Sequence, residues 1–160
     1  MAALPMGTFP KTIVFLVEAK YAKYKDWKMS ALLVEARDHF NRFIRNRDSD
    51  ENGRGFCISS GRPLKVPSKT AHAGHYYPAK NFPQLRFNED NVHLQSEADN
   101  YYLHGNAKAY RVSLISKIGY ERVKVLDEAA KQERRGIFKW DRVEVIDIIE
   151  KYKALNHERN

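Results

Sequence analysis

The sequence predicts an α+β domain, with a small β-containing centre and helices before and after it. Apolar residues recur at helical spacing over residues 30–47. Short strand-like segments occur around 70–77 and 91–95, and residues 107–156 again follow a helical pattern. A chain of 160 residues with 42% hydrophobic residues can bury a core of its own, so we expect residues 1–160 to form a single domain.

The composition favours a polyanionic partner. The formal net charge is +8, which suits nucleic acid before a membrane surface, although excess lysine also serves solubility. No apolar run approaches the roughly 18 residues of a membrane span, and the start MAALPMGTFPK lacks the pattern of a secretory signal. The single cysteine, Cys57, excludes an internal disulfide and a closed multi-cysteine zinc site. We therefore expect a cytoplasmic protein without a membrane partner.

The first element predicted with clarity is a helix over 30–47, with Ser30 placed to cap it. Before it, residues 1–29 form an N-terminal extension whose order the pattern leaves open. Within this extension, TIVFLVEAKY (12–21) resembles a short buried strand followed by a charged exit. Four arginines gather on or beside the polar face of the helix: Arg37, Arg42, Arg45 and Arg47. These arginines predict either an ordinary solvated face or contacts with phosphates.

The middle of the chain predicts short strands joined by turns. The polar loop DSDENGRG (48–55) ends the first helix, and FCISSGRPLKVP (56–67) reads as two strands around a turn at Gly61. Residues 69–95 are irregular apart from the two strand-like segments already named. Ser96 with Asp99 three residues later has the pattern of a capping box. This pattern predicts the start of a short helix within 96–106, which Gly105 ends or bends.

Three helices are predicted for the C-terminal part, residues 107–156. The first spans 107–119 and stops at Gly119, and the second spans 120–135. Asp141 and Glu144 form a second capping box that opens a helix over 141–156. We expect the apolar faces of these helices to complete the core or to form a dimer face.

Two segments carry the residues suited to chemistry. TAHAGHYYPAK (70–80) places two histidines three residues apart, and NEDNVHLQSEADNYYLHGN (88–106) is rich in Asn and His. The order is a strand with His, a long loop, a strand with Asn and then a helix with Asn. This layout resembles the His–Asn–His (HNH) motif of ββα-metal nucleases. The resemblance implies an HNH-like ββα-metal core over 56–106, flanked by the N-terminal helix and the C-terminal helices.

With its flanks included, the pattern is similar to the bacteriophage lambda NinG family of recombination endonucleases, also called Rap. The resemblance covers roughly residues 30–156 and rests on the block from HAGH (72–75) to GN (105–106). It implies a metal-dependent, structure-specific endonuclease for branched DNA, such as Holliday junctions and D-loops. It also implies a phage- or prophage-encoded protein that works in the bacterial host. A homodimer would suit a symmetric junction.

The chain departs from the family at the positions of a structural zinc. The family usually carries two CxxC-like knuckles, whereas here the first reads Cys57-Ile58-Ser59-Ser60 and the second runs from Ser96 to Asp99. Three of the four expected thiolates are absent, and one thiolate with hydroxyls and a carboxylate makes a poor tetrahedral zinc site. We therefore expect no structural zinc. The Ser96–Asp99 capping box is the expected replacement for it.

The resemblance also assigns roles within the motif. His75 is the expected general base, because imidazole with a pKa near 6.5 accepts a proton from water at neutral pH. Asn91 matches the central Asn that orients this base, or it serves only as a turn residue. One Mg²⁺ or Mn²⁺ is expected, and its predicted ligands are His72, Asn100 and His104. His72 is alternatively a buried polar brace. The alternative for His104 is a residue without a catalytic role at a helix C-terminus.

Three basic residues flank the motif and are expected to hold the DNA backbone: Lys69, Lys80 and Arg86. Tyr76 and Tyr77 lie beside the motif, and core packing is their preferred use over base contact. Two alternatives to the branched-DNA nuclease remain open. One is a catalytically degenerate phage DNA-binding protein, and the other is a general HNH nicking nuclease.

Overall fold

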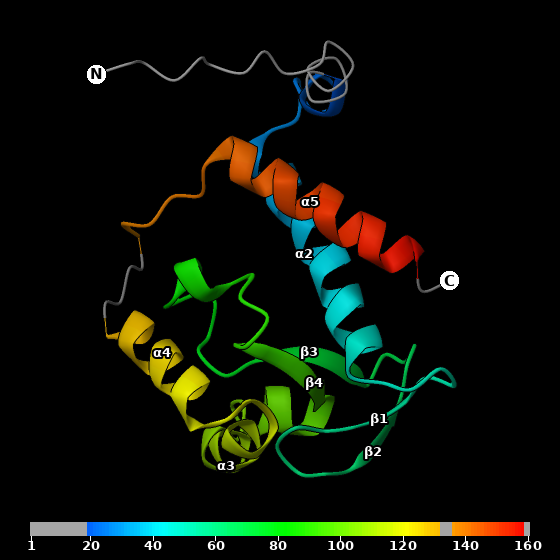
Figure 1. Cartoon of the computed structure of the whole chain (residues 1–160), viewed down its shortest axis with the longest axis vertical. Helices are drawn as coiled ribbons and strands as arrows, with labels where there is room; N and C mark the ends of the chain where they lie inside the picture. Colours follow the sequence, from blue (N-terminus) through cyan, green and yellow to red (C-terminus); the bar gives the residue numbers. More distant parts are fainter. Residues whose placement is uncertain (1–18, 132–135, 159–160) are drawn as a thin grey trace, which may run out of the picture.

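The computed structural model describes residues 19–131 and 136–158. The chain is a mixed α+β protein with helices and two small antiparallel sheets, as the sequence predicts (Figure 1). In chain order the elements are α2 (Met29–Arg47), β1 (Arg54–Phe56), β2 (Pro63–Lys65), β3 (Ala71–His75), the 3₁₀ turn η1 (Pro83–Leu85), β4 (Val92–Ser96), the π-helical turn η2 (Ala98–Tyr102), α3 (Ala107–Ile118), α4 (Tyr120–Ala130) and α5 (Arg142–His157).

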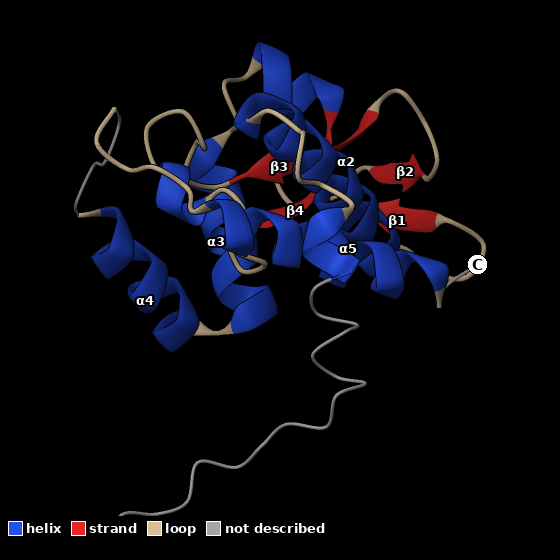
Figure 2. Ribbon diagram, turned by 90° about the horizontal axis from the view of Figure 1, so that it is seen from above, coloured by secondary structure: helices blue, strands red, loops and turns tan. Residues whose placement is uncertain are grey.

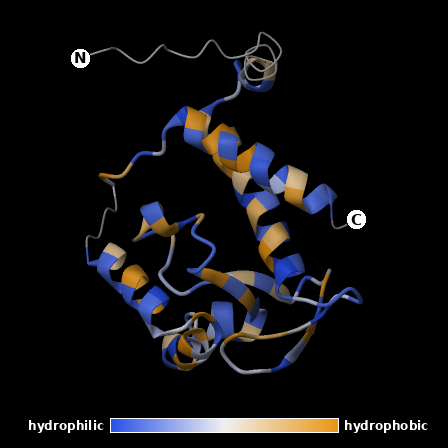
Figure 3. Cartoon of the chain, viewed as in Figure 1, coloured by the Kyte–Doolittle hydropathy of each residue, from blue (hydrophilic) through white to orange (hydrophobic). Residues whose placement is uncertain are grey.

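The long helices α2 and α5 lie side by side, although residues 48–141 separate them in the sequence (Figure 1). Hydrophobic and hydrophilic residues alternate along both helices, as expected for amphipathic helices (Figure 3). The buried apolar residues of α2 recur every four residues, and those of α5 lie along one face of the helix: Leu32, Ala36, Phe40 and Ile44 in α2, and Val145, Ile146, Ile149 and Tyr152 in α5. These side chains form the larger hydrophobic core, and their spacing confirms the two predicted amphipathic helices.

The ends of the helices test the predicted caps. Asp141 accepts hydrogen bonds from the backbone N–H groups of Val143 and Glu144, and the Glu144 carboxylate accepts from the N–H of Asp141. The capping box at α5 is therefore confirmed. The predicted cap at Ser30 is wrong, because α2 begins one residue before it and Lys28 is the N-cap, without a side-chain hydrogen bond.

The N-terminal strand predicted at 12–21 lies mostly outside the described residues. Its last three residues, which are predicted as the charged exit after the strand, belong to a short helical segment over 19–22. This segment is followed by turns that lead to α2. Tyr24, within these turns, is buried in the core shared by α2 and α5.

The two sheets are separate, and β2, β3 and β4 lie at the predicted strand segments. In contrast, β1 lies earlier than predicted, because its first two residues belong to the expected polar loop 48–55. β1 pairs with β2, and β3 pairs antiparallel with β4 in the register Ala71↔Ser96 and His75↔Val92. Every residue of β4 is buried. Figure 2 shows β3 and β4 in the middle of the molecule, with β1–β2 on one side and α4 on the other.

A second hydrophobic core joins α3 and α4 to the segment after β3. Tyr110 of α3 is fully buried, and its hydroxyl donates to the carbonyl of Gly74 at 2.9 Å. Tyr76 and Tyr77 pack against the same cluster, and the Tyr77 hydroxyl donates to Asp127 at 2.7 Å. Their use in packing is therefore confirmed. This core fixes the position of the end of β3, where His75 lies.

Candidate active site

A cavity of about 470 Å³ opens at the end of β3. Its walls come from that strand, from the segment that follows it, and from the turn after β4. Ten residues line it: Ala73, His75, Tyr76, Pro78, Ala79, Lys80, Asn100, His104, Gly105 and Ala107. The cavity thus brings together four of the residues predicted from the sequence, namely His75, Lys80, Asn100 and His104.

His75 is the last residue of β3 and is held by the loop that returns to β4. Its Nε2–H donates to the carbonyl oxygen of Arg86 at 3.0 Å. This hydrogen bond fixes the tautomer in which Nδ1 carries the lone pair. Burial lowers the pKa of His75, and the nearby Arg86 guanidinium lowers it further, against the opposing effect of the carbonyl. The ring is therefore neutral at physiological pH and can accept a proton through Nδ1.

Asn91 is fully buried and acts on the loop between β3 and β4. Its Nδ2 donates to the carbonyls of Tyr77 at 3.0 Å and Leu85 at 3.1 Å, and its Oδ1 accepts from the Tyr77 N–H at 2.8 Å. All of its side-chain hydrogen bonds among the described residues go to backbone groups. Because Leu85 precedes Arg86, Asn91 fixes the carbonyl that orients His75 and thus affects the ring indirectly.

His72 lies on β3 but not in the lining of the cavity. Its Nε2–H donates to the carbonyl of Lys69 at 3.0 Å, and its Nδ1 accepts from Nδ2 of Asn100 at 3.0 Å. Both ring nitrogens are therefore engaged, which leaves none for a metal ion in this arrangement. His72 instead holds the carboxamide of Asn100, the role of a polar brace.

Asn100 and His104 approach the cavity from the turn after β4. The predicted short helix is a five-residue π-helical turn, and His104 lies just beyond it in the left-handed region with φ of 51°. Since Nδ2 of Asn100 donates to His72, Oδ1 is the atom of this side chain that can bind an ion. The His104 ring has no hydrogen-bond partner among the described residues. Its nitrogen atoms are therefore a second possible ligand for a metal ion at the same wall of the cavity.

This donor set can be compared with the expected metal. Among residues 19–131 and 136–158, no group of three His, Cys, Asp or Glu side chains is placed to hold an ion. Asn100 and His104 offer one amide oxygen and one imidazole nitrogen, a pair that suits Mn²⁺ better than Mg²⁺. An ion at this site would have two protein groups as ligands and would take the rest of its coordination from phosphate oxygens and water.

The positions of the two altered knuckles meet at a single carboxylate. Ser60 and Ser96 each donate to Oδ2 of Asp99 at 2.6 Å, and the Cys57 thiol lies 3.2 Å from the same oxygen. Asn106 donates to Oδ1 at 2.8 Å. These five residues are called the Asp99 cluster below. The cluster connects the β1–β2 turn, the end of β4 and the start of α3 through these hydrogen bonds.

The predicted capping box at Ser96 is half formed. The Ser96 hydroxyl accepts from the backbone N–H of Asp99 at 3.1 Å, but the N–H of Ser96 points to the sulfur of Cys57 at 3.2 Å. Burial raises the pKa of Asp99, but hydrogen bonds from Ser60, Ser96 and Asn106 outweigh it, so the pKa lies well below its usual range. The ionised carboxylate is therefore the centre that holds η2 in place.

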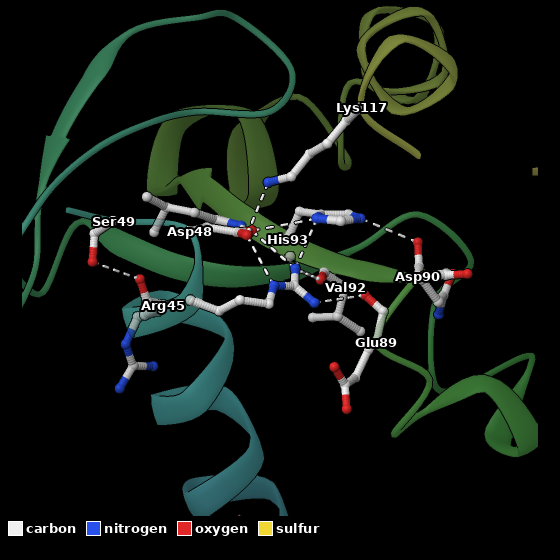
Figure 4. Close-up of polar contacts among 12 residues, drawn as sticks. Arg45, Asp48, Ser49, Glu89, Asp90, Val92, His93 and Lys117 are labelled. Atoms are coloured by element: carbon white, nitrogen blue, oxygen red, sulfur yellow. Dashed lines mark hydrogen bonds and ion pairs between the residues drawn. The ribbon is translucent and has the colours of Figure 1, made fainter. Parts of the chain in front are cut away.

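A second buried carboxylate, Asp48, was not singled out from the sequence. It accepts hydrogen bonds from Arg47 at 2.9 Å and from the N–H of Leu94 at 2.9 Å, and Lys117 of α3 forms an ion pair with it at 2.8 Å (Figure 4). Burial raises the pKa of Asp48, and contacts with His93, Arg47 and Lys117 lower it far more. Asp48 therefore joins α2, β4 and α3.

His93 faces this carboxylate from β4 (Figure 4). Its Nε2 lies 3.2 Å from the carbonyl of Asp90 and its Nδ1 lies 2.8 Å from Nη2 of Arg47. Burial lowers the pKa of His93 despite the neighbouring Asp48. Nδ1 also lies 3.3 Å from Oδ2 of Asp48, so the polar contacts of the buried ring join β4 to the end of α2 and to the loop before β4, and His93 is a structural residue.

The three predicted DNA-binding residues lie at different places around the site. Lys80 is exposed and lines the cavity. Arg86 is half-buried, and its carbonyl accepts the hydrogen bond from His75. Lys69 is exposed just before β3, and its carbonyl accepts from His72. The cavity thus has one cationic side chain, Lys80, in its wall. Lys69 and Arg86 lie in the segments whose backbone carbonyls hold His72 and His75.

Fold and cavity together define a basic α+β protein with a site lined by histidine and asparagine. The family model described as Bacteriophage Lambda NinG protein matches residues 17–160, and the chain belongs to this family. The family predicted from the sequence is thereby confirmed.

Curated relatives agree with this assignment. The chain is 40% identical over 102 residues to Protein ninG of Escherichia phage lambda and, to the same degree, to Protein ninG of Enterobacteria phage H19B. It is 39% identical over 102 residues to Protein ninG of Salmonella phage P22. In each case the alignment covers 64% of this chain and 47% of the relative. The chain thus spans about half the length of the curated relatives it matches. No solved structure matches the chain.

Within the described part of the chain, no helix has both the length and the apolar character needed to cross a bilayer.

Proposed function

We propose that this protein is a divalent-metal-dependent DNA endonuclease of the HNH type, which hydrolyses phosphodiesters in branched recombination intermediates such as Holliday junctions and D-loops. The observation that carries the proposal is the cavity that a neutral, oriented His75 shares with Lys80, Asn100 and His104. Membership in a phage protein family and the net charge of +8 support a nucleic-acid substrate.

The chemistry assigned to His75 follows from its tautomer. Nδ1 removes a proton from a water molecule, whose oxygen then forms a bond to phosphorus as the opposite P–O bond breaks. Nε2–H stays bound to the carbonyl of Arg86, which keeps the ring in place during the transfer. Asn91 supports this arrangement because it holds the loop that carries this carbonyl. The proton that leaves the water is available for the departing oxygen through solvent.

The remaining residues of the cavity would neutralise the charge of the phosphate or hold the metal ion. Lys80 lies in the wall and offsets the negative charge of the phosphate. Asn100, braced by His72, and His104 would hold the divalent ion. A bound Mn²⁺ or Mg²⁺ supplies Lewis acidity that stabilises charge on the phosphate oxygens.

A degenerate DNA-binding protein is the second candidate, and a specific observation favours it. Among the residues that the structure describes, no carboxylate lines the cavity, and His72 uses both ring nitrogens in hydrogen bonds with Lys69 and Asn100. A sparse ligand set lowers metal affinity, because Mg²⁺ in phosphoryl-transfer sites is usually held by one or two carboxylates. This candidate predicts binding of junctions with a steep dependence on salt and no cleavage with any metal.

The deciding experiment incubates the purified protein with a labelled four-way junction and a matched linear duplex, in Mg²⁺, Mn²⁺ or EDTA. His75→Ala is compared with His157→Ala, whose histidine is exposed on α5 far along the chain. Metal-dependent cleavage of the junction that only His75→Ala abolishes supports the proposal. Binding without cleavage in every metal supports the degenerate protein, and equal cleavage of the duplex supports a general nicking nuclease.

A further inference from the structure

Three consecutive apolar side chains stand exposed at the edge of the cavity. Tyr101, Tyr102 and Leu103 are 73%, 71% and 57% exposed, and they lie in the chain between Asn100 and His104, which both line the cavity. The two tyrosine rings are edge to face with centroids 5.9 Å apart. Single exposed apolar residues are ordinary in proteins, but three in succession beside a candidate active site indicate a contact surface.

The backbone under these residues is fixed at both ends. On one side, Asp99 is held by the serines of the Asp99 cluster. On the other side, the carbonyl of Gly105 accepts from Nε2 of the buried Gln95 at 2.7 Å, and the N–H of Gly105 donates to the carbonyl of Asp99 at 2.9 Å. The exposure of Tyr101 and Tyr102 is therefore a property of an anchored turn.

We propose that Tyr101 and Tyr102 stack on unpaired bases at the branch point of a DNA substrate while the adjacent phosphates enter the cavity. This inference rests on the proposed function and names the part of the substrate that this turn recognises. Every base has a π-face, so aromatic side chains bind unpaired bases with little regard to sequence. Bases within a continuous duplex are covered by their neighbours, and stacking on the turn therefore distinguishes a branch from a linear duplex.

The charges around the turn favour DNA over a second copy of the chain. Lys108 is exposed shortly after the turn, and Lys80 lines the cavity beside it. A polyanion complements these cations and the net charge of +8, whereas two copies of the chain repel each other. Three side chains are also few compared with the roughly 20–30 residues that each partner contributes to a stable protein interface.

The test measures binding in EDTA, so that its result does not depend on cleavage. The full chain is titrated with a fluorescent four-way junction and with a linear duplex of the same length. The double variant Tyr101→Ala/Tyr102→Ala removes both rings, and Tyr101→Phe/Tyr102→Phe retains them. Tyr120→Ala is the matched control, because Tyr120 is 58% exposed on α4.

The alanine pair should weaken binding to the junction about tenfold or more and leave duplex binding within about twofold, since stacking on a base is worth about that factor or more. The phenylalanine pair and Tyr120→Ala should bind both DNAs as the wild type does. Unchanged junction binding by the alanine pair overturns the inference and leaves the nuclease proposal intact. An equal loss for junction and duplex, or a wild-type dimer that the alanine pair dissociates, also overturns it. A wild type that binds neither DNA overturns both proposals.

Discussion

Ser60 and Ser96 donate hydrogen bonds to the same oxygen of Asp99, each at 2.6 Å, although Ser60 follows β1 and Ser96 ends β4. Their convergence connects the β1–β2 turn to the turn that presents Asn100 and His104. The geometry of the cavity therefore depends on a buried carboxylate outside it, and this dependence can be measured.

Replacement of Asp99 by Asn should destabilise the protein by about 3 kcal/mol, because an amide has one acceptor oxygen where the carboxylate has two, so its NH₂ group must face either the serine hydroxyls or the Nδ2 donor of Asn106. The measurement is the free energy of unfolding in urea. Asp38→Asn is the matched control, since Asp38 lies on the surface of α2 beside Arg37 and its loss should cost less than about 1 kcal/mol. Equal unfolding midpoints for the wild type and Asp99→Asn would show that the cluster contributes nothing.

Stability should fall in acid below about pH 4. The pKa values of Asp48 and Asp99 are both lowered by folding, because burial is outweighed by their hydrogen bonds and ion pairs. The unfolded chain then takes up protons near its ordinary pKa of about 3.9 while the folded chain does not, so the stabilisation is present above that pH and lost below it. Urea unfolding at a series of pH values measures the slope. In Asp99→Asn the slope should be smaller, and an unchanged slope would contradict the assignment to Asp99.

The rate of cleavage should stay level from about pH 8 to pH 7 and decline only below about pH 6.5, the ordinary pKa of histidine. Burial lowers the pKa of His75, so its ring stays neutral and basic until the solution is more acidic than this value. The measurement is the single-turnover rate on a junction as a function of pH. Binding in EDTA over the same range is the control. A rate that already declines at pH 7.5 would mean that another group titrates.

Loss of the two proposed metal ligands should weaken metal binding without loss of the fold. Asn100→Ala and His104→Ala should each raise the Mn²⁺ concentration for half-maximal cleavage about tenfold or more. Direct titration of Mn²⁺ by electron paramagnetic resonance in the presence of junction DNA gives a second measurement that does not depend on turnover. His39→Ala is the control, since His39 lies on α2 beside Glu35. Mn²⁺ titrations identical to the wild type would exclude both residues as ligands.

Gly74 should not tolerate a side chain. A Cβ atom at this position would lie 2.0 Å from Oε1 and 2.8 Å from Cβ of Gln95, a fully buried side chain whose Nε2 is held by hydrogen bonds to Ser59 and Gly105. Gly74→Ala should therefore cost about 2–3 kcal/mol of stability. Gly105→Ala is the comparison, because a Cβ there meets nothing within 4 Å and only its φ of +87° opposes the change. It should cost about 1 kcal/mol. A smaller loss for Gly74→Ala than for Gly105→Ala would contradict the steric argument.

Much of the fold could be predicted from periodicity. The spacing of Leu32, Ala36 and Phe40 predicts the buried face of α2, and the Asp141 capping box predicts the start of α5, because both signals are local. The prediction of a cap at Ser30 is wrong for a local reason as well. The extended residue Lys28 is the N-cap, so α2 begins at Met29, before Ser30. The β-pairings were predictable as segments, whereas their register required the structure.

The candidate site was less accessible to sequence reasoning. His75, Asn100 and His104 follow from the resemblance, but the partners of His72 depend on a contact between residues 28 positions apart. The exposed pair Tyr101 and Tyr102 gave no signal, because aromatic residues in a short helical segment normally indicate a core face. The side chains that converge on Asp99 belong to segments about 40 residues apart, and no local pattern reports such a meeting.

The pairing of α2 with α5 has a consequence for synthesis of the protein. The apolar face of α2 leaves the ribosome before α5, the helix that packs on it. The α5 residues Val145 and Ile149 are made about a hundred residues later. Until then a nascent chain exposes Phe40 and Ile44 to solvent, a state prone to aggregation and to capture by chaperones. A chain released before α5 would therefore keep the histidines of the cavity yet lack the partner that closes the larger core.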